Sequence, residues 1–471
     1  MLQKVATTGV GLENVYYQTL RRIREQRSDR SRLGMEVLMW VSHSKRPLRI
    51  DELCHALAIE MGTSDLDNEN IPPQDTVLGS CLGLVTVNKE TSTVKLIHYT
   101  LQEYLSLPGI LPNAHKTLAE SCLAYLNYDR VKELPANQIS ALGDMPFLEY
   151  STLYWGSHAK IGLSDHAKSL ALKLLNRFGD HISATLLCDQ IQIPHRGPLS
   201  HRLFSGLHCV SYLGIDELVA ALIRMKSYNI NQADCMGFTP LMWASLQENQ
   251  GAVELLLAQG NASPDNPGNG GRTPLHLASG QGHEGVVRQL LPWSEVGLNR
   301  QDNDGRTPLY HASSNGHEGV VRLLLSQYNV DPDKPDYRGQ TPLCSASQNG
   351  HAEVVKLLLA RGDVNPDKAD RKGQTPLQWA SSIGNEGIVR LLLPRSRVDP
   401  NKLNHDGRTP LWVAAFDGRE GMVRLLLTRD DINPNLTSSD GQTPLAVASL
   451  RGHMEIVALL QGRTTAVSGI D

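Results

Sequence analysis

The C-terminal half of the chain repeats one pattern of apolar and polar positions every 34 residues. Each copy contains a Thr-Pro-Leu triplet, then an alanine five residues after the threonine, and later a Val-x-x-Leu pair. The threonines that mark the copies are Thr239, Thr273, Thr307, Thr341, Thr375, Thr409 and Thr443. A fixed period of about 20 to 50 residues indicates one small supersecondary unit stacked on copies of itself.

Each copy predicts two short helices that follow a tight turn. A glycine two residues before the threonine supplies the positive φ of the turn. The threonine hydroxyl caps the first helix, and proline suits its first position. A second glycine ends this helix in most copies, and the Val-x-x-Leu pair gives the second helix its apolar stripe. Asp-Pro or Asn-Pro steps, as in 330–333, then break the second helix.

These positions together resemble the ankyrin repeat, over seven units in register. The period is 34 rather than the usual 33 residues, and we expect the extra residue in the loop after the second helix. Ankyrin repeats usually carry a histidine after Thr-Pro-Leu that helps to hold the turn, and only His276 stands there among the seven. The resemblance therefore implies that the other six turns are held less firmly. Their residues in this slot are Met242, Tyr310, Cys344, Gln378, Trp412 and Ala446.

A degenerate eighth unit is expected before the seven. Counting back 34 residues from Leu241 gives Leu207, in a stretch that predicts two short helices but lacks Thr-Pro. Terminal repeats are often atypical because they cap the stack. We therefore assign residues 200–236 to a capping repeat, 237–463 to seven repeats and 464–471 to a frayed tail.

The N-terminal half has a different pattern. Residues 11 to about 60 predict three helices, the last capped by Asp51, and a polar loop follows at 65–73. Two alternating segments, 84–87 and 93–97, predict a β-hairpin. Three helices and a hairpin form a winged-helix-like domain, which we place at 11–107, with a helical linker domain at 112–195.

Short motifs in this half resemble the region after the nucleotide-binding domain of fungal NACHT–ankyrin proteins, which are STAND-class, NLR-like signalling proteins. The motifs are Arg46-Pro47-Leu48, Gly83-Leu84-Val85, Leu96-Ile97-His98-Tyr99-Thr100, Gln102-Glu103-Tyr104-Leu105, Phe147-Leu148-Glu149-Tyr150 and Tyr154-Trp155-Gly156-Ser157-His158-Ala159. Proteins of that family are driven by a P-loop ATPase domain, and no Gly-x-x-x-x-Gly-Lys-Ser/Thr motif occurs here. We expect either a gene model that lacks an upstream module or a relative without the ATPase.

Composition narrows the function classes. The net charge is −4, divided as −1 up to residue 196 and −3 beyond it, so neither half has the basic excess of a nucleic-acid binder. No run of about 18 apolar residues and no secretory signal is visible. Seven scattered cysteines without a Cys-x-x-Cys pair favour reduced, mostly buried thiols. We expect an intracellular protein, in the cytoplasm or the nucleus.

No catalytic, metal-binding or cofactor-binding motif is found, so we expect no enzyme activity, no cofactor and no metal. The recurring histidines 283, 317, 351 and 453 are expected to pack between neighbouring repeats rather than to bind a metal. The acidic pair Asp302 and Asp304 is expected to be solvated loop, and Cys344 a buried thiol.

The repeat positions whose residue type varies from one copy to the next are the candidate protein-binding positions. In the ankyrin fold they face the concave side, and exposed Trp, Phe and Arg are enriched at interface hot spots. Local packing against neighbouring repeats is the alternative for each aromatic side chain. The candidate protein-binding residues are Trp243, Arg272, Arg306, His311, Trp379, Arg408 and Phe416.

The sequence thus predicts a mainly α fold, with a winged-helix-like and helical N-terminal region followed by an ankyrin-repeat α-solenoid. The expected function is a non-enzymatic scaffold or receptor-like module that binds a protein ligand, in NLR-like signalling or non-self recognition. Two alternatives stay open. One is a regulator that uses the winged helix on DNA, and the other is the effector-sensing part of an ATP-driven STAND switch. The identity of the partner, the oligomeric state and the independent folding of the N-terminal half also stay open.

Overall fold

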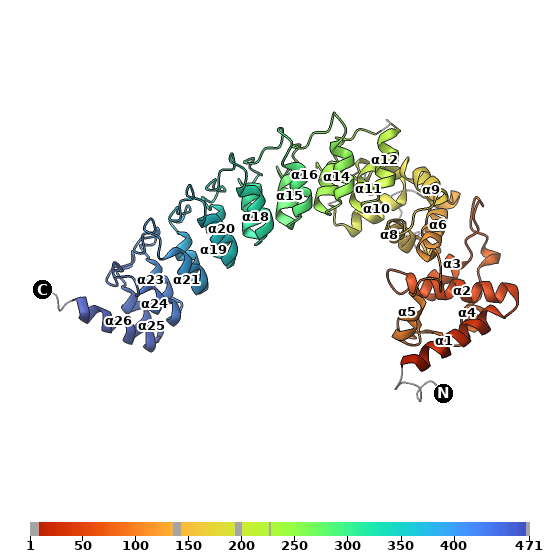
Figure 1. Cartoon of the computed structure of the whole chain (residues 1–471), viewed down its shortest axis with the longest axis horizontal. Helices are drawn as coiled ribbons and strands as arrows, with labels where there is room; N and C mark the ends of the chain where they lie inside the picture. Colours follow the sequence, from red (N-terminus) through yellow and green to blue (C-terminus); the bar gives the residue numbers. More distant parts are fainter. Residues whose placement is uncertain (1–8, 135–142, 194–199, 226–227, 468–471) are drawn as a thin grey trace. The chain divides into compact units, whose positions relative to one another are not determined.

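The computed structural model describes residues 9–134, 143–193, 200–225 and 228–467, which are mainly helical (Figure 1). The chain divides into two compact units, Met1–Pro240 and Leu241–Asp471. The predicted fold class is confirmed, with a winged-helix region in the first unit and a stack of helix pairs in the second.

The first unit begins with the expected three helices and hairpin, and adds one helix that the sequence pattern missed. The elements are α1 (Gly9–Arg24), α2 (Ser28–His43), α3 (Ile50–Leu57), α4 (Gln74–Ser80), β1 (Val85–Val87) and β2 (Val94–Leu96). The strands pair antiparallel, with Val85 opposite Leu96. Helix α4 has only seven residues, so its apolar positions are too few to show a helical period.

The start of α3 differs from the prediction that Asp51 is its cap. The helix begins at Ile50 with Arg49 as its N-cap, and Asp51 lies within the first turn, where its Oδ1 accepts the Glu52 N–H at 2.8 Å. Glu52 is buried and accepts the Arg49 backbone N–H at 2.7 Å. The Arg46 guanidinium donates to both of its oxygens, at 2.8 and 2.7 Å. A buried carboxylate is stable only with such partners, so this pair fixes the entry into α3.

The rest of the first unit is helical. It contains α5 (Tyr99–Leu105), α6 (Ala114–Leu126), α7 (Asp129–Lys132), α8 (Leu148–Ala159), α9 (Asp165–Leu175), α10 (Ile182–Gln190), α11 (Gly206–Leu213) and α12 (Asp216–Arg224). Helices α6 and α8 pack against each other, and Phe147, Tyr150 and Trp155 of the motifs at 147–150 and 154–159 are buried. Phe147 meets Trp40 of α2 edge-on at 5.3 Å, and the Tyr150 hydroxyl accepts the Lys45 N–H at 3.1 Å. These contacts join the helical region to the winged helix.

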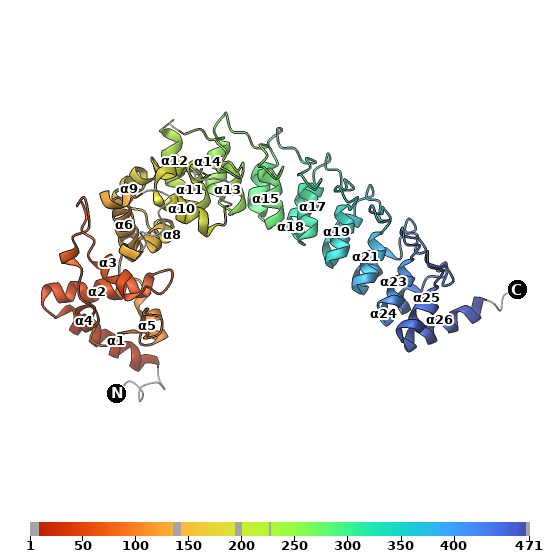
Figure 2. The same cartoon turned by 180° about the vertical axis from the view of Figure 1, so that it is seen from behind.

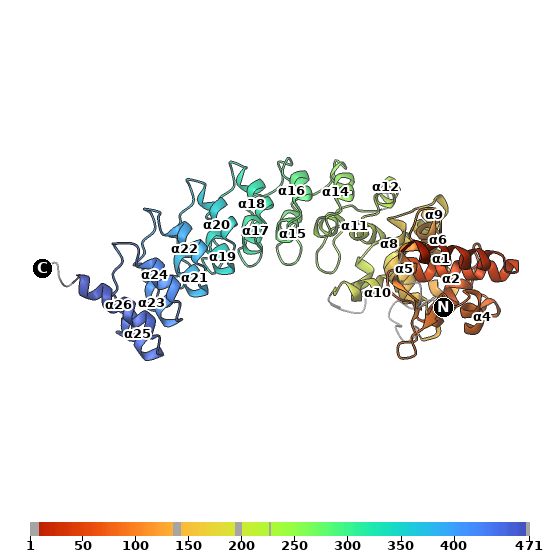
Figure 3. The same cartoon turned by 60° about the horizontal axis from the view of Figure 1, so that its bottom comes forward.

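The second unit consists of seven helix pairs arranged side by side. The first helices are α13 (Pro240–Leu246), α15 (Pro274–Gln281), α17 (Pro308–Ser314), α19 (Pro342–Asn349), α21 (Pro376–Ile383), α23 (Pro410–Phe416) and α25 (Pro444–Arg451). The second helices are α14 (Gln250–Leu257), α16 (Glu284–Leu290), α18 (Glu318–Leu325), α20 (Ala352–Leu359), α22 (Glu386–Leu392), α24 (Glu420–Leu426) and α26 (Met454–Val467). First helices contact first helices, and second helices contact second helices, so two layers form (Figures 2 and 3).

The turn and capping residues behave as the repeat pattern predicts. All seven turn glycines have positive φ, between 69° and 80°. From Thr273 to Thr443, each repeat threonine is the N-cap of its first helix and its hydroxyl accepts the N–H three residues on. The predicted role of the recurring histidines between repeats is also confirmed. His283, His317 and His351 each bond a carbonyl in the first helix of the preceding repeat through Nε2, at 2.9 to 3.0 Å, and His453 bonds the Phe416 carbonyl at 3.3 Å.

The expectation that six turns are held less firmly is wrong for Gln378. His276 accepts the Thr273 N–H on Nδ1, and its Nε2 donates to two carbonyls of the next turn. Gln378 reproduces all three bonds, because Oε1 accepts the Thr375 N–H at 2.9 Å and Nε2 donates to two carbonyls of the following turn. An amide carries one acceptor and one donor group, as a neutral imidazole does.

Three further side chains in this slot each make part of the same connection. The Trp412 indole donates to the Gln442 carbonyl at 3.0 Å, and the Cys344 thiol donates to the Lys368 carbonyl at 3.3 Å. The Tyr310 hydroxyl donates to the Gln340 side chain at 3.1 Å. The turns of these repeats are therefore tied to their neighbours without a histidine.

Candidate protein-binding surface

The turns before the first helices form one continuous edge of the second unit. In each turn, the two residues before the turn glycine form the tip, for example Asn303 and Asp304 before Gly305. From the second repeat to the seventh, a backbone hydrogen bond joins each tip to the next, at 2.9 to 3.0 Å. The bonds run from Asn303 N to Gly270 O, Tyr337 N to Asp304 O, Arg371 N to Arg338 O, His405 N to Lys372 O and Ser439 N to Asp406 O. We call these tips, together with the first helices, the turn face.

A buried acid holds each central turn from within. Asp302, Asp336 and Asp370 each accept two backbone N–H groups of their own turn, at 2.8 to 3.0 Å. The prediction of a solvated loop is therefore wrong for Asp302, which is 2% exposed. Burial would raise the pKa of Asp302, but hydrogen bonds from His311 and from two backbone N–H groups outweigh burial and lower the pKa to about 2. The acid stays charged and the turn stays closed.

Two of the predicted binding residues help to hold these turns, each through the buried acid of its own repeat. His311 Nε2 donates to Asp302 Oδ2 at 2.8 Å, and Trp379 Nε1 donates to Asp370 Oδ2 at 3.2 Å. Trp243 occupies the equivalent slot and is only 2% exposed. The proposal of Trp243 as a contact residue does not fit this burial, since a partner would reach almost none of its ring. Trp379 is half-buried, so one part of its ring holds the turn and another part faces outward.

The predicted arginines are each paired with an acid of the ankyrin stack. Each lies beside an acid of its own or the next turn. The pairs are Arg272 with Asp302 at 3.6 Å, Arg306 with Asp304 at 3.3 Å and Arg408 with Asp406 at 3.6 Å. Ion pairs at such an exposed surface contribute little to stability, but they cancel charge that a partner would otherwise meet.

Arg408 and Phe416 belong to a layered stack near the end of the second unit. The Arg408 guanidinium lies 4.5 Å from the Trp412 ring centre, and Trp412 stacks on Phe416 at 5.2 Å and 14°. Arg451 covers the other side of Phe416 at 3.9 Å. Because these side chains already make cation–π and stacking contacts with one another, we assign Arg408 and Phe416 mainly to local packing. Phe416 is half-buried.

Sequence reasoning missed three cations on the turn tips that lack an acidic partner. Arg338, Arg371 and Lys372 are exposed at two successive tips, beside the exposed Tyr337. With Gln340, Gln348, Asp370 and Trp379 they line an open hollow of about 540 Å³. In the parts of the chain that the structure describes, none of the three forms an ion pair, unlike Arg306 and Arg408. The signal was present in the tip residues, which change from Asn-Asp to Tyr-Arg, Arg-Lys, His-Asp and Ser-Asp along the stack.

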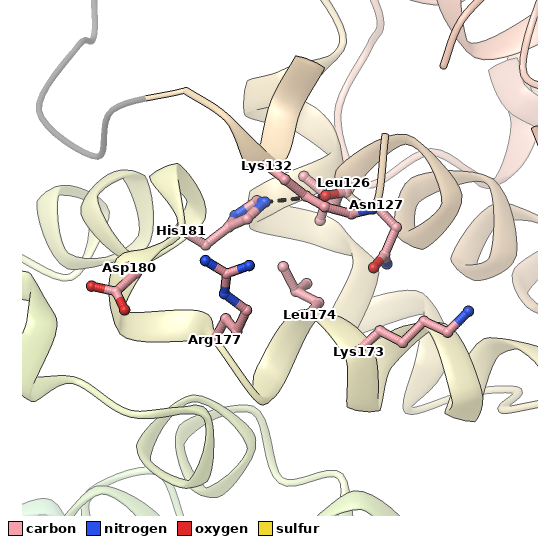
Figure 4. Close-up of a pocket in the computed structure, with 8 residues that line it drawn as sticks. All are labelled: Leu126, Asn127, Lys132, Lys173, Leu174, Arg177, Asp180 and His181. Carbon is pink, nitrogen blue, oxygen red and sulfur yellow. Dashed lines mark hydrogen bonds between the residues drawn. The ribbon is translucent and has the colours of Figure 1, made fainter. Parts of the chain in front are cut away.

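A smaller hollow in the first unit is lined by Leu126, Asn127, Lys132, Lys173, Leu174, Arg177, Asp180 and His181 (Figure 4). Its volume is about 40 Å³, and the His181 ring bonds the Leu126 carbonyl at 3.1 Å. Figure 4 shows the Lys173 ammonium directed away from the Arg177 guanidinium, so the cations do not converge on a ligand.

Nothing in the described residues marks a reactive centre. All seven cysteines are free thiols, six of them buried, and burial raises the pKa of Cys54 to about 11 and of Cys344 to about 12. No group of three or more His, Cys, Asp or Glu there is arranged to hold a metal ion. Among the described helices, none has both the length and the apolarity to cross a bilayer.

Comparison with protein families agrees with this architecture. Residues 261–336, 329–404 and 384–467 match a model described as ankyrin repeats (3 copies), and 236–269 match the single ankyrin repeat. Residues 24–111 match a model described as GPI inositol-deacylase, winged helix domain. The chain therefore carries an N-terminal winged helix and a C-terminal ankyrin-repeat stack. A comparison with curated proteins finds no match to the chain.

Proposed function

We propose that this chain is a non-enzymatic protein-interaction module that binds a protein ligand on the turn face of its ankyrin stack. The observation that carries the proposal is the hollow around Trp379 and Tyr337, where aromatic surface and unpaired cations lie on a turn ladder fixed by backbone bonds. A surface fixed before binding loses little conformational entropy when a partner docks. Ankyrin stacks serve protein binding in general, which supports the same assignment.

We also propose that residues 200–236 are a degenerate ankyrin repeat. Ser205 and His208 stand where the other repeats have threonine and the turn histidine. His208 accepts the Ser205 N–H at 3.1 Å, and its Nε2 bonds the Gln232 and Phe238 carbonyls, as His276 does in its own repeat. This bonding supports boundaries of 200–236 and 237–463 for the repeats, after a winged-helix domain at 11–107 and a helical linker at 112–195.

An NLR-like role in signalling or non-self recognition is part of this proposal. It is supported by the winged-helix match and by burial of the aromatic residues in the motif 147–150. In such a role, the ankyrin stack would capture the ligand and the N-terminal half would respond to it.

Site-directed photo-crosslinking tests the proposed binding face. A photoreactive amino acid replaces Tyr337 on the turn face or, as the matched control, exposed Arg322 on the second-helix face. Peptides selected from a displayed library against the full chain should crosslink from position 337 and not from position 322. Crosslinking only from 322, or no enrichment of any peptide, would contradict the proposed function.

We expect no sequence-specific DNA binding by the winged helix. In helix-turn-helix proteins the second helix of the motif reads the major groove. That helix is α4, which has Asp75 in its first turn and no Lys or Arg. Fluorescence anisotropy with labelled duplex DNA at low salt should therefore show no binding by the full chain. Affinity that falls steeply as salt increases would instead support the DNA regulator.

A further inference from the structure

The charge on the turn tips changes sign along the ankyrin stack. The tips of the third, sixth and seventh repeats end in an acid, and those of the fourth and fifth carry Arg338, Arg371 and Lys372. Where the tip holds Asp304 or Asp406, an arginine two residues on pairs with it. In the two basic repeats this position holds a neutral glutamine, Gln340 or Gln374. The positive charge of these tips is therefore not cancelled within the turn. The turn tips thus have a local positive region within a unit of overall negative charge.

The cations of this region are held close together. The Arg371 N–H donates to the Arg338 carbonyl at 2.9 Å, so the backbones of the two basic tips are bonded directly to each other. The nearest acid in the hollow, Asp370, is buried and already accepts two backbone N–H groups and the Trp379 indole. Like charges placed side by side repel each other, and an anionic partner that relieves this repulsion is favoured.

Aromatic surface lies beside the cations and is fixed in position. Tyr337 is 56% exposed, and its ring packs over Gly305, where a Cβ atom would come within 2.6 Å of Tyr337 Cδ1. The Trp379 ring is held by its bond to Asp370. Gln340 and Gln348 also line the hollow, and Gln340 Nε2 donates to Gln348 Oε1 at 3.0 Å. The exposed Tyr337 ring and the half-buried Trp379 ring offer apolar surface to a side chain of the partner.

We propose that this surface of the fourth and fifth repeats binds an acidic, Asp- and Glu-rich segment of the partner protein. Its carboxylates pair with Arg338, Arg371 and Lys372, and one apolar or aromatic side chain packs against Tyr337 and Trp379. Arginine binds a carboxylate through two parallel hydrogen bonds, which gives orientation as well as attraction. The inference rests on the proposed function and names the chemistry of its ligand.

The flanking tips limit the length of the segment. Asp304 lies before the basic tips and Asp406 after them, so further acids in the ligand would meet like charge. Neighbouring helices pack about 8–10 Å apart, and an extended chain advances about 3.3 Å per residue. Two repeats therefore span about 16–20 Å, or about five to six extended residues, and an acidic core of about four residues fits within this length.

The experiment uses the full chain and two displayed octapeptide libraries. One library fixes Asp or Glu at four central positions, and the other has Asn or Gln at the same positions. The first should enrich and the second should not. Replacing the cations, as Arg338→Gln, Arg371→Gln and Lys372→Gln together, should weaken the selected peptides about tenfold or more, since each exposed pair contributes up to about 1 kcal/mol.

A second triple variant removes the same charge from the second-helix face. Arg322→Gln, Lys356→Gln and Arg390→Gln should change the affinity less than about twofold, because these exposed side chains lie on the other layer. Equal enrichment of the amide library, equal loss in both triple variants, or tighter binding of single-stranded DNA than of the acidic peptides would overturn the acidic-segment inference. Crosslinking of a ligand from position 337 in those cases would leave the proposed function standing.

Discussion

Replacing Gln378 by alanine is expected to lower the free energy of unfolding of the ankyrin stack by about 2–3 kcal/mol. The Gln378 side chain is 1% exposed and makes three hydrogen bonds, to the Thr375 N–H and to the Lys402 and Arg408 carbonyls. Alanine would leave these buried groups without a partner, and each unpaired group costs about 1–3 kcal/mol before water or a shift of the chain compensates. The loss concerns the connection between two repeats rather than one helix alone.

Gln378→His is the matched control, because the imidazole of His276 makes the same three bonds in its own repeat. Chemical denaturation should place Gln378→His within about 1 kcal/mol of the parent chain, and hydrogen exchange at the Thr375 amide should accelerate only in the alanine variant. If the alanine variant matched the parent in both measurements, the proposed role of this slot would be wrong.

Lowering the pH from 7 to 5 is expected to destabilise the Met1–Pro240 unit by about 2 kcal/mol for each of two buried histidines. Burial, together with the smaller effects of the neighbouring His115, Lys45 and His43, lowers the pKa of His158 from 6.5 to about 3. Burial also lowers the pKa of His181 to about 4. Both values lie below that of the unfolded chain, so the unfolded state takes up protons first. The stability that depends on keeping these two histidines neutral is fully present above about pH 6.5 and is lost as the pH falls below that value.

The pH effect can be checked in two ways. The slope of the unfolding free energy against pH gives the number of protons taken up on unfolding. Between pH 6 and 4 this number should fall by about one in His158→Gln and stay unchanged in His166→Gln, whose histidine is exposed. Since His158 bonds both Tyr150 and His115, at 3.0 and 2.9 Å, its replacement can also weaken packing. NMR titration of the parent chain avoids this problem, and a His158 ring that titrates near pH 6.5 would refute the explanation.

The repeat architecture could be predicted because its signal occurs seven times. Turn glycines, Thr caps and inter-repeat histidines each have a local physical cause, and the structure bears them out. Helix α4 could not be found, since seven residues give fewer than two turns of periodicity. The equivalence of Gln378 and histidine was hidden as well, because it depends on where donor and acceptor atoms lie rather than on residue type.

The binding residues were the least predictable part. Trp243 and Trp379 occupy the same slot of the repeat, yet one is 2% exposed and the other half-buried. Residue type alone does not give exposure, which depends on what packs alongside. Likewise, Arg306 and Arg338 differ in their available charge only because one has an acid beside it. Comparing the tips with one another, instead of ranking aromatic and arginine residues one at a time, would have found the basic region.

The ladder of backbone bonds along the tips has a consequence for how such a protein can diversify. Main-chain atoms make every bond of that ladder, so a tip can exchange its side chains without breaking any of them. Recognition and folding are thereby placed on different atoms of the same residue. A lineage under pressure from changing targets can vary its specificity by single codon changes at the tips, at little risk to the scaffold, and a protein engineer can use the same positions as a combinatorial library.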